Sequence, residues 1–235
     1  MKIFRMIGAG AAISMALGGA AMAAGPSMES FYFGAAAGWD YSDYDSGGFN
    51  TVGVFNNTND DSDDSAVGSF FAGFDDLFML GPVTLRAEVE GMAIGKKDIV
   101  TDSFAPPNPT FFYQTSVRSY AGLFNLWADV RPFTGIPVVL SVGGGVGVAR
   151  HEIETNDTVV GGDAHDTTLA YALGAQAAYE FSPTVSAGVM GRYTDFGESE
   201  INLTSNVGGG SAGDYSLDHS GAQVMGFIRF HFGAN

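Results

Sequence analysis

Arg86, Glu88 and Glu90 occupy every second position of a short segment, and the positions between them hold the apolar residues Ala87 and Val89. We call each set of alternate positions in such a segment a parity. Arg192 and Arg229 occupy alternating positions of the same kind much later in the chain. Opposite charges in such positions either neutralise one another in a buried interior or line a narrow passage and select solutes. The whole polar set with this alternation is Arg86, Glu88, Glu90, Gln176, Glu180, Arg192, Gln223, Arg229 and His231.

Groups for nucleophilic or metal chemistry are sparse. The chain has no cysteine, so thiol nucleophiles, disulfides and zinc thiolate sites are excluded. His219 and Ser220 are adjacent, but neighbours in a strand point to opposite faces and cannot act together as base and nucleophile. His151 and His165 lie among acids without ligand spacing, and the acidic run 59–65 lacks the pattern of a calcium loop. We therefore predict no catalytic set, no metal and no cofactor.

Composition restricts both the partners and the fold class. The 235 residues carry a net charge of −16, so the chain repels phosphate backbones and binding to nucleic acid is not expected. Glycine is costly inside helices, whereas aromatic residues favour strands. With 34 glycines and 13% aromatic residues, the sequence predicts an all-β fold.

The elements that position the charges are clearest between Leu169 and Gly197, where two alternating segments are joined by a Ser-Pro-Thr turn. Because strand side chains alternate between faces, this pattern predicts a hairpin with one apolar face and one small or polar face. A soluble barrel of the lipocalin type would place the apolar face inward, around a ligand. Here the apolar parity excludes nearly every charge, which favours contact between that face and lipid.

The segment 31–41 strengthens the membrane interpretation. Its apolar parity has Phe31 and Phe33 at one end, Trp39 and Tyr41 at the other, and alanines between them. Aromatic side chains favour the two interfaces of a bilayer, and small apolar residues suffice between them. The same pattern is expected of a strand that crosses a membrane.

The first 23 residues have the pattern of a secretory signal peptide, with Lys2 and Arg5 before an apolar centre and Ala21-Met22-Ala23 before the expected cut. We therefore expect a signal peptide at 1–23 and one barrel domain at 24–235. Without Lys2 and Arg5 the chain keeps 8 basic and 26 acidic residues, a net charge of −18. No later segment is long enough for a spanning helix, so only a closed barrel could cross a membrane.

Eight alternating segments are expected to form strands. They are 31–41, 66–75, 83–94, a segment within 113–129, 138–149, 169–181, 185–194 and 222–232. Arg118 shares its parity with the apolar residues of the fourth strand, so the facing of that strand is ambiguous and we place Arg118 at the outer rim. Inner glycines of the fifth strand are expected to make room for long side chains of other strands.

Connections between these strands are alternately long and short. The long ones are expected at 42–64, 95–111, 150–166 and 198–215. Membrane barrels have short turns on the periplasmic side and long loops outside. The sequence thus predicts an eight-stranded antiparallel up-and-down transmembrane β-barrel with four long external loops, short periplasmic turns and both termini periplasmic. A barrel of this size is just wide enough for side chains to fill, so the paired charges would plug the lumen.

Several stretches resemble the outer membrane β-barrel proteins of the OmpA-like transmembrane type, which include small surface antigens and opacity-type proteins of Gram-negative bacteria. The stretches are LRAEVEG (85–91), VGGGVGVA (142–149), LGAQAAYEFSPTVSAGVMGRYTDFG (173–197) and HSGAQVMGFIRFHF (219–232). The resemblance implies an outer membrane location, contact with outer membrane lipids, and periplasmic chaperones and a barrel-assembly machinery during biogenesis. It assigns Phe230 and Phe232 to the assembly signal, although three residues follow Phe232 here.

The expected function is a structural or surface-interaction role, in which acidic external loops contact a partner that the sequence does not identify. A narrow porin-like channel for small solutes is the alternative, since lumen arginine and glutamate can select as well as fill. A lipid-modifying outer membrane enzyme is a further alternative, because function is carried by sites rather than by folds. No catalytic set supports it, and we expect a protein that is not an enzyme.

Overall fold

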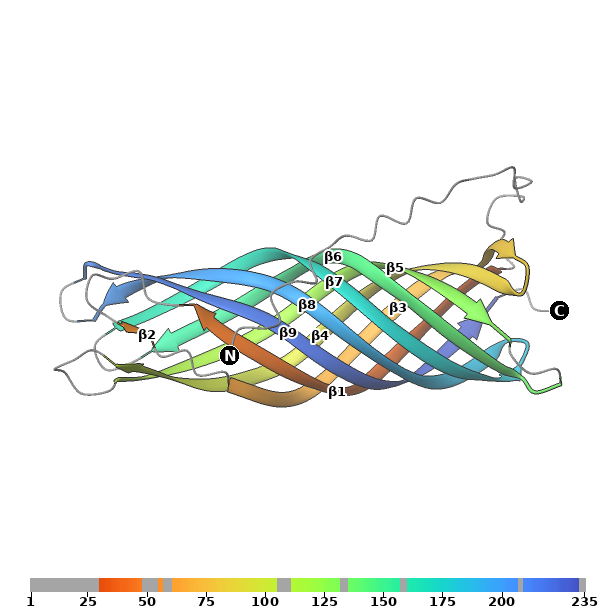
Figure 1. The fold of residues 1–235 in the computed structure, drawn as a ribbon, viewed down its shortest axis with the longest axis horizontal. Helices are drawn as coiled ribbons and strands as arrows, with labels where there is room; N and C mark the ends of the chain where they lie inside the picture. Colours follow the sequence, from red (N-terminus) through yellow and green to blue (C-terminus); the bar gives the residue numbers. More distant parts are fainter. Residues whose placement is uncertain are drawn as a thin grey trace.

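The chain forms a long closed barrel of β-strands (Figure 1). The structure is a computed structural model and describes residues 30–47, 55–56, 61–104, 111–131, 135–156, 160–206 and 209–232. The expected signal peptide at 1–23 lies outside these residues. Among the residues described, no helix is long and apolar enough to cross a membrane.

Eight long strands make the wall. They are β1 (Phe31–Gly47), β3 (Asp61–Leu80), β4 (Val83–Phe104), β5 (Phe111–Val130), β6 (Val138–Asn156), β7 (Val160–Ser182), β8 (Val185–Ser205) and β9 (Ser211–His231). A two-residue strand, β2 (Phe55–Asn56), pairs with β4. Each long strand pairs antiparallel with its neighbours along the chain. The ring closes where β1 pairs with β9, with Phe33 opposite Phe230 and Trp39 opposite Val224. The predicted eight-stranded antiparallel barrel is confirmed.

The two ends of the barrel differ. At the end that we call the turn end, the strands are connected through 81–82, 131–137 and 183–184, and the strand termini Phe31 and His231 also lie there. At the opposite end, the extended end, the strands continue well beyond their predicted limits. Parts of the predicted loops 42–64, 95–111, 150–166 and 198–215 are strand instead, so these loop boundaries were wrong.

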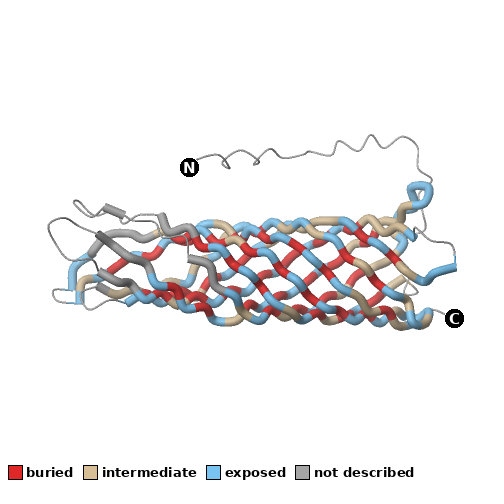
Figure 2. The backbone as a smooth tube through the Cα atoms, turned by 60° about the horizontal axis from the view of Figure 1, so that its bottom comes forward, coloured by how far each residue is buried: buried red, intermediate tan, exposed pale blue. Residues whose placement is uncertain are grey.

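Outward and inward residues alternate along every long strand, which Figure 2 shows as successive exposed and buried positions. Over part of each strand the outward positions carry only uncharged residues, chiefly aliphatic, aromatic or glycine. We call this zone the apolar belt. Its segments are 31–41, 66–74, 83–93, 120–130, 138–148, 169–181, 185–193 and 222–232. All eight segments have at least the length of about 9 to 11 residues that a tilted strand needs to cross a bilayer.

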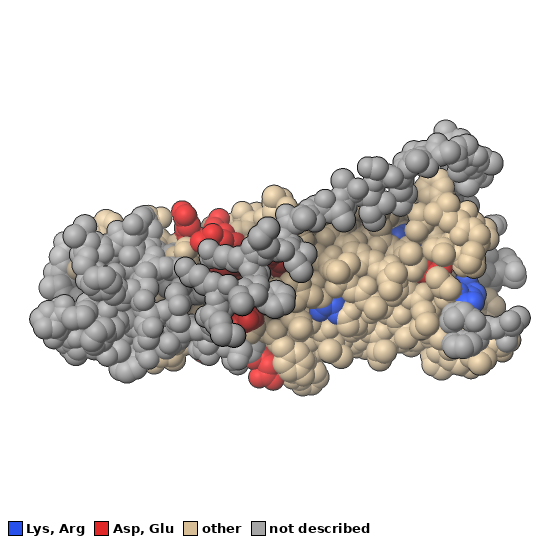
Figure 3. Space-filling model, in the orientation of Figure 1, with Lys and Arg blue, Asp and Glu red and all other residues tan. Residues whose placement is uncertain are grey.

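Beyond the apolar belt the pattern changes. Charged residues take outward positions, while the inward positions hold polar groups such as Lys97, His151 and His219 together with a layer of apolar residues. Most acidic side chains visible in Figure 3 lie on this part of the wall, to the left of the uncharged surface. On β6, Glu152 and Glu154 point outward on either side of the buried Ile153. The extended end is therefore a water-facing continuation of the same barrel.

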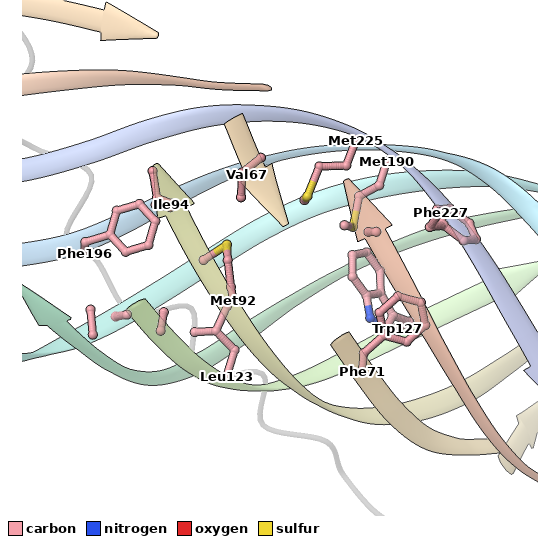
Figure 4. Packing of buried hydrophobic residues seen from close by; sticks show 14 of the residues in the cluster. Val67, Phe71, Met92, Ile94, Leu123, Trp127, Met190, Phe196, Met225 and Phe227 are labelled. Atoms are coloured by element: carbon pink, nitrogen blue, oxygen red, sulfur yellow. The ribbon is translucent and has the colours of Figure 1, made fainter. Parts of the chain in front are cut away.

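The interior of the apolar belt holds large apolar side chains as well as charges. Figure 4 shows Trp127, Phe71 and Phe227 with methionines of β4, β8 and β9 inside the barrel. Inner glycines create the space: a Cβ at Gly143 would lie 2.6 Å from the ring of Trp127, and one at Gly145 would lie 1.9 Å from the side-chain oxygen of Asn125. The expectation that inner glycines of β6 accommodate long side chains of another strand is confirmed.

Candidate functional site: the barrel interior and the outer wall

Arg86 is the centre of a charge cluster near the turn end. Its side chain is fully buried and donates hydrogen bonds to Glu88 (3.0 Å), Asp129 (3.0 Å) and Gln176 (3.1 Å). The hydroxyl of Tyr32 accepts a further bond from Arg86 and donates one to Glu88 at 2.8 Å. Charge-assisted bonds from a planar guanidinium to several strands fix the packing of the lumen at this level.

Arg229 enters the same cluster without a carboxylate partner within 4.0 Å among the described residues. It donates to Gln176 at 3.2 Å, and its guanidinium lies over the rings of Tyr32 (4.9 Å) and Phe227 (5.2 Å). Cation–π contacts of this kind stabilise a desolvated guanidinium. The arginines of the lumen therefore do not pair one to one with the glutamates, since Asp129 and aromatic rings also take part.

Arg192 and Glu90 form a second buried pair, farther from the turn end. A guanidinium nitrogen of Arg192 lies 2.6 Å from Glu90 Oε2, and both side chains are 1% exposed. Arg192 Nε also donates to Gln223 Oε1 at 2.6 Å, while Asn125 donates to Glu90 at 2.9 Å. The pair joins β4 to β8 across the lumen, and the amides of Asn125 and Gln223 extend it to β5 and β9.

A third buried pair, Lys97 with Asp40, lies next toward the extended end. Lys97 Nζ is 2.8 Å from Asp40 Oδ2, and both side chains are 0% exposed. Gln223 Nε2 donates to Asp40 Oδ1 at 2.9 Å and links this pair to Arg192. The sequence reasoning missed the pair because Lys97 was expected in a loop. Asp40 already had the inward parity in the sequence, which was the available signal.

Ser42, His219, Ser119 and His151 form a chain of buried contacts at the same level. The distance from Ser42 Oγ to His219 Nε2 is 2.8 Å, and Ser119 Oγ lies 2.9 Å from His151 Nδ1. The His219 ring is stacked between two aromatic rings of neighbouring strands. Asp40 accepts a bond from the Ser42 hydroxyl rather than from the imidazole. This is not the order of a nucleophile, base and orienting acid.

An apolar layer fills the lumen beyond these polar groups. Its members come from strands all around the barrel and are at most 2% exposed: Tyr44, Ile99, Val117, Ile153, Ile201, Leu203 and Leu217. We call it the outer apolar layer. The sequence reasoning did not foresee it, because most of its residues fall in segments that were expected to be loops, and Val117 lies in the predicted strand whose facing was ambiguous.

The remaining predicted residues lie at the turn-end rim or on the outer surface. Glu180 accepts a hydrogen bond from Arg131 at 2.7 Å, and this pair is partly exposed. His231 Nδ1 lies 2.8 Å from Asp75 Oδ2, with both side chains about one-fifth exposed. Phe230 and Phe232 point outward, and both pack against Phe33. The predicted polar set thus divides into an enclosed group and a rim group that contains Glu180 and His231.

No triple of histidine, aspartate or glutamate that could hold a metal ion occurs in the described part of the chain. The acidic run 59–65, for which we expected no calcium loop, lies partly outside the described residues. On the outer wall, Asp163, Glu198 and Glu200 border a shallow polar depression of about 560 Å³ together with His165. Its walls are exposed and acidic, in line with the charge of the chain.

The barrel has the same fold as several solved structures. The outer membrane protease OmpT from Escherichia coli has a TM-score of 0.54 with 9% identity, and the match covers 89% of this chain and 99% of that chain. OprG from Pseudomonas aeruginosa has a TM-score of 0.52 with 13% identity, covering 86% and 97%. This fold is that of the outer membrane β-barrels. No family model matches the sequence, and no curated protein matches it at a significant level. At these identities the likeness concerns the fold.

Proposed function

We propose that this chain is an integral outer membrane protein with a closed lumen, and that it acts as a structural or surface-interaction barrel. The observation that carries the proposal is the filling of the interior at successive levels. Arg86 and its partners come first, followed by the Arg192–Glu90 pair, the Lys97–Asp40 pair and the outer apolar layer. The uncharged outward face supports a location in lipid, since a basic side chain at mid-bilayer costs about 2 to 4 kcal/mol.

The distribution of charge supports an orientation with the turn end in the periplasm. Short turns occupy that side in membrane barrels, and the longer, water-exposed part faces outside. The acidic wall of the extended end would then be the external surface. Because this wall is made of strands, an external partner would meet side chains held on a rigid sheet, in addition to the residues that connect the strands.

A closed lumen is the physical consequence of the buried pairs. Two charges taken out of water are tolerated only when they are paired and hydrogen-bonded, so breaking them open for a passing solute is costly. The outer apolar layer adds a dry barrier beyond them, where an ion would lose its hydration without any polar replacement. We therefore favour a filled barrel over a narrow channel.

Single-channel recording in planar bilayers tests this proposal. The wild-type protein should show no steady open state, and Arg192→Ala should also remain closed, because the outer apolar layer still blocks the path. A large and steady wild-type conductance would contradict the proposal and favour the channel. Conductance in Arg192→Ala alone would show that the charge pair, rather than the apolar layer, closes the lumen.

We further propose that the C-terminal strand β9 serves assembly through its outward aromatic residues. Phe230 and Phe232 form an aromatic cluster with Phe33 and Phe31 at the turn end, on the surface that faces lipid. The assembly machinery can bind an exposed aromatic cluster at the end of the last strand before the barrel closes. Phe230→Ala with Phe232→Ala should reduce the amount of protein that reaches the membrane in cells, while the purified variant still folds in detergent.

A further inference from the structure

On each long strand, the first outward residue beyond the apolar belt is basic, acidic or uncharged, and these charges are distributed unevenly around the barrel. One such residue can be named on each long strand: Asp43 on β1, Asp64 on β3, Lys96 on β4, Arg118 on β5, Arg150 on β6, Thr167 on β7, Asp195 on β8 and Ser220 on β9. The basic residues occupy three adjacent strands, β4, β5 and β6. The acidic ones occupy β8 and β1, which lie across the barrel, and β3, which is paired with the basic strand β4.

This basic group stands out in a chain with few bases. Ten lysines and arginines occur in the sequence, and two of them belong to the expected signal peptide. Of the other eight, four are buried in the lumen and Arg131 lies at the turn end. The remaining three are Lys96, Arg118 and Arg150. Among the described residues they are therefore the only lysine and arginine side chains on the outer wall of the extended end, and they lie at a similar height along the barrel.

The strand register brings the three side chains together. Arg150 is paired with Tyr120 across β5 and β6, and Arg118 is paired with Glu152. Arg118 and Arg150 are thus diagonal neighbours, with Cα atoms about 7 to 8 Å apart. Lys96 lies in the irregular stretch of β4 between Ile94 and Lys97, next to the Arg118 segment of β5. All three side chains are exposed.

The two arginines have no ion-pair partner within 4.0 Å among the described residues, although Glu152 is a cross-strand neighbour of Arg118. Lys96 lies 3.7 Å from Asp98. A hydrogen bond from Ser116, together with Lys96, holds the pKa of Asp98 below its ordinary value. Lys96 is therefore partly neutralised by a carboxylate that stays ionised, and the two arginines provide most of the available positive charge.

Position along the barrel axis indicates the partner. The next outward residues toward the turn end are Tyr120, which follows Arg118 on β5, and Val148, which precedes Arg150 on β6. These two residues end the apolar belt on their strands. A tyrosine at the edge of an apolar zone marks the membrane interface, where lipid headgroups begin. Guanidinium groups at this depth meet headgroup phosphates, which they bind through paired charge-assisted hydrogen bonds.

We propose that Arg118 and Arg150, assisted by Lys96, bind the phosphate groups of a phosphorylated lipid in the outer leaflet. The inference rests on the proposed membrane location and orientation. Asp43 and Asp195 repel phosphate on the opposite side of the barrel, and Asp64 on β3 borders the basic group next to β4. The lipid is therefore held on the face formed by β4, β5 and β6. The partner is a lipid rather than free phosphate because the apolar belt directly below accommodates its acyl chains.

The test compares binding of diphosphorylated lipid A by the full-length protein in phosphatidylcholine nanodiscs. Binding is measured by native mass spectrometry as the lipid A fraction is raised, for the wild type, Arg118→Gln with Arg150→Gln, and the control Arg131→Gln. Arg131 is also an exposed arginine but lies at the turn end. The double variant should bind about tenfold more weakly, a loss of about 1.4 kcal/mol. The control should bind as the wild type does, and removal of both phosphates from the lipid should abolish the difference.

Equal binding by wild type and double variant, or equal weakening in the Arg131→Gln control, would overturn the inference. Competition by inorganic phosphate at concentrations comparable to the lipid would also overturn it, by showing a site for the free anion. Insertion is read separately, as heat-dependent migration on a gel. Inserted protein without the phosphate preference refutes this inference alone, whereas failure to insert contradicts the proposed membrane location as well.

Discussion

Replacing Arg192 by methionine should destabilise the barrel far more than the same change at Arg131. Arg192 lies 2.6 Å from Glu90, both side chains are 1% exposed, and Arg192 also holds Gln223. Its loss leaves a buried carboxylate with the neutral donor Asn125. Removing one partner of such a pair costs about 3 to 5 kcal/mol, because the other charge stays buried without compensation.

Arg131 provides a matched control. Its distance to Glu180 is also short, at 2.7 Å, but the two side chains are 58% and 33% exposed. Exposed pairs contribute only about 0 to 1 kcal/mol. The free energy of unfolding is measured by urea titration in lipid vesicles, with folding followed by tryptophan fluorescence and gel migration. Adding Glu90→Gln to Arg192→Met should recover part of the loss. Equal effects of the two single arginine variants would refute the burial argument.

Three further changes test other levels of the structure. Lys97→Met should cost about 3 to 5 kcal/mol because Asp40 is left buried without a cation, with only the neutral donors Ser42 and Gln223, whereas Lys96→Met should cost less than about 1 kcal/mol; urea titration compares them. Gly147→Ala should destabilise by about 1 to 3 kcal/mol because its Cβ would lie 1.8 Å from a backbone oxygen, while Gly91→Ala has open space and should be nearly neutral. Val142→Arg, at an outward position that is 63% exposed, should cost about 2 to 4 kcal/mol in a bilayer and much less in detergent micelles.

Each of these has a clear contrary outcome. Equal stability of the two lysine variants would mean that Lys97 is not enclosed with Asp40. A neutral Gly147→Ala would show that the strands at that point are not in close contact. An arginine at position 142 that is tolerated equally well in bilayers and micelles would place that part of β6 outside the hydrocarbon.

The parity of the strands in the apolar belt could be predicted from sequence because a lipid-facing side excludes charge over a whole strand. Leu173, Val189 and Phe70 are outward, as the alternation indicates. At the extended end the strands also alternate with a period of two, but there the outward residues include charged ones and many of the inward residues are apolar. In ESEINLTS, Glu198 and Glu200 face water, while Ile201 faces the lumen. A polar, charged stretch was interpreted as a loop although its alternation was present.

The charge partners in the lumen could be predicted only in part. Parity alone indicated that Arg86, Glu90 and Arg192 face inward, but it did not indicate which of them meet. That depends on the stagger between strands, which decides that Arg192 meets Glu90 while Lys97 meets Asp40. The bulge before Lys97 shifts its parity relative to the preceding strand, so the alternation of 83–94 could not be extended to it.

The central claim is that apolar side chains face hydrocarbon while the lumen is dry and filled. The direct measurement is labelling of the wild-type protein in intact bilayers by a lipid-soluble diazirine, whose photogenerated carbene inserts into side chains that contact hydrocarbon. Labelled positions on β9 are identified by mass spectrometry. We predict label at Val224 and Ile228 and none at Met225, which points inward. Label at Met225 with none at the other two would contradict the account and place the apolar face inside.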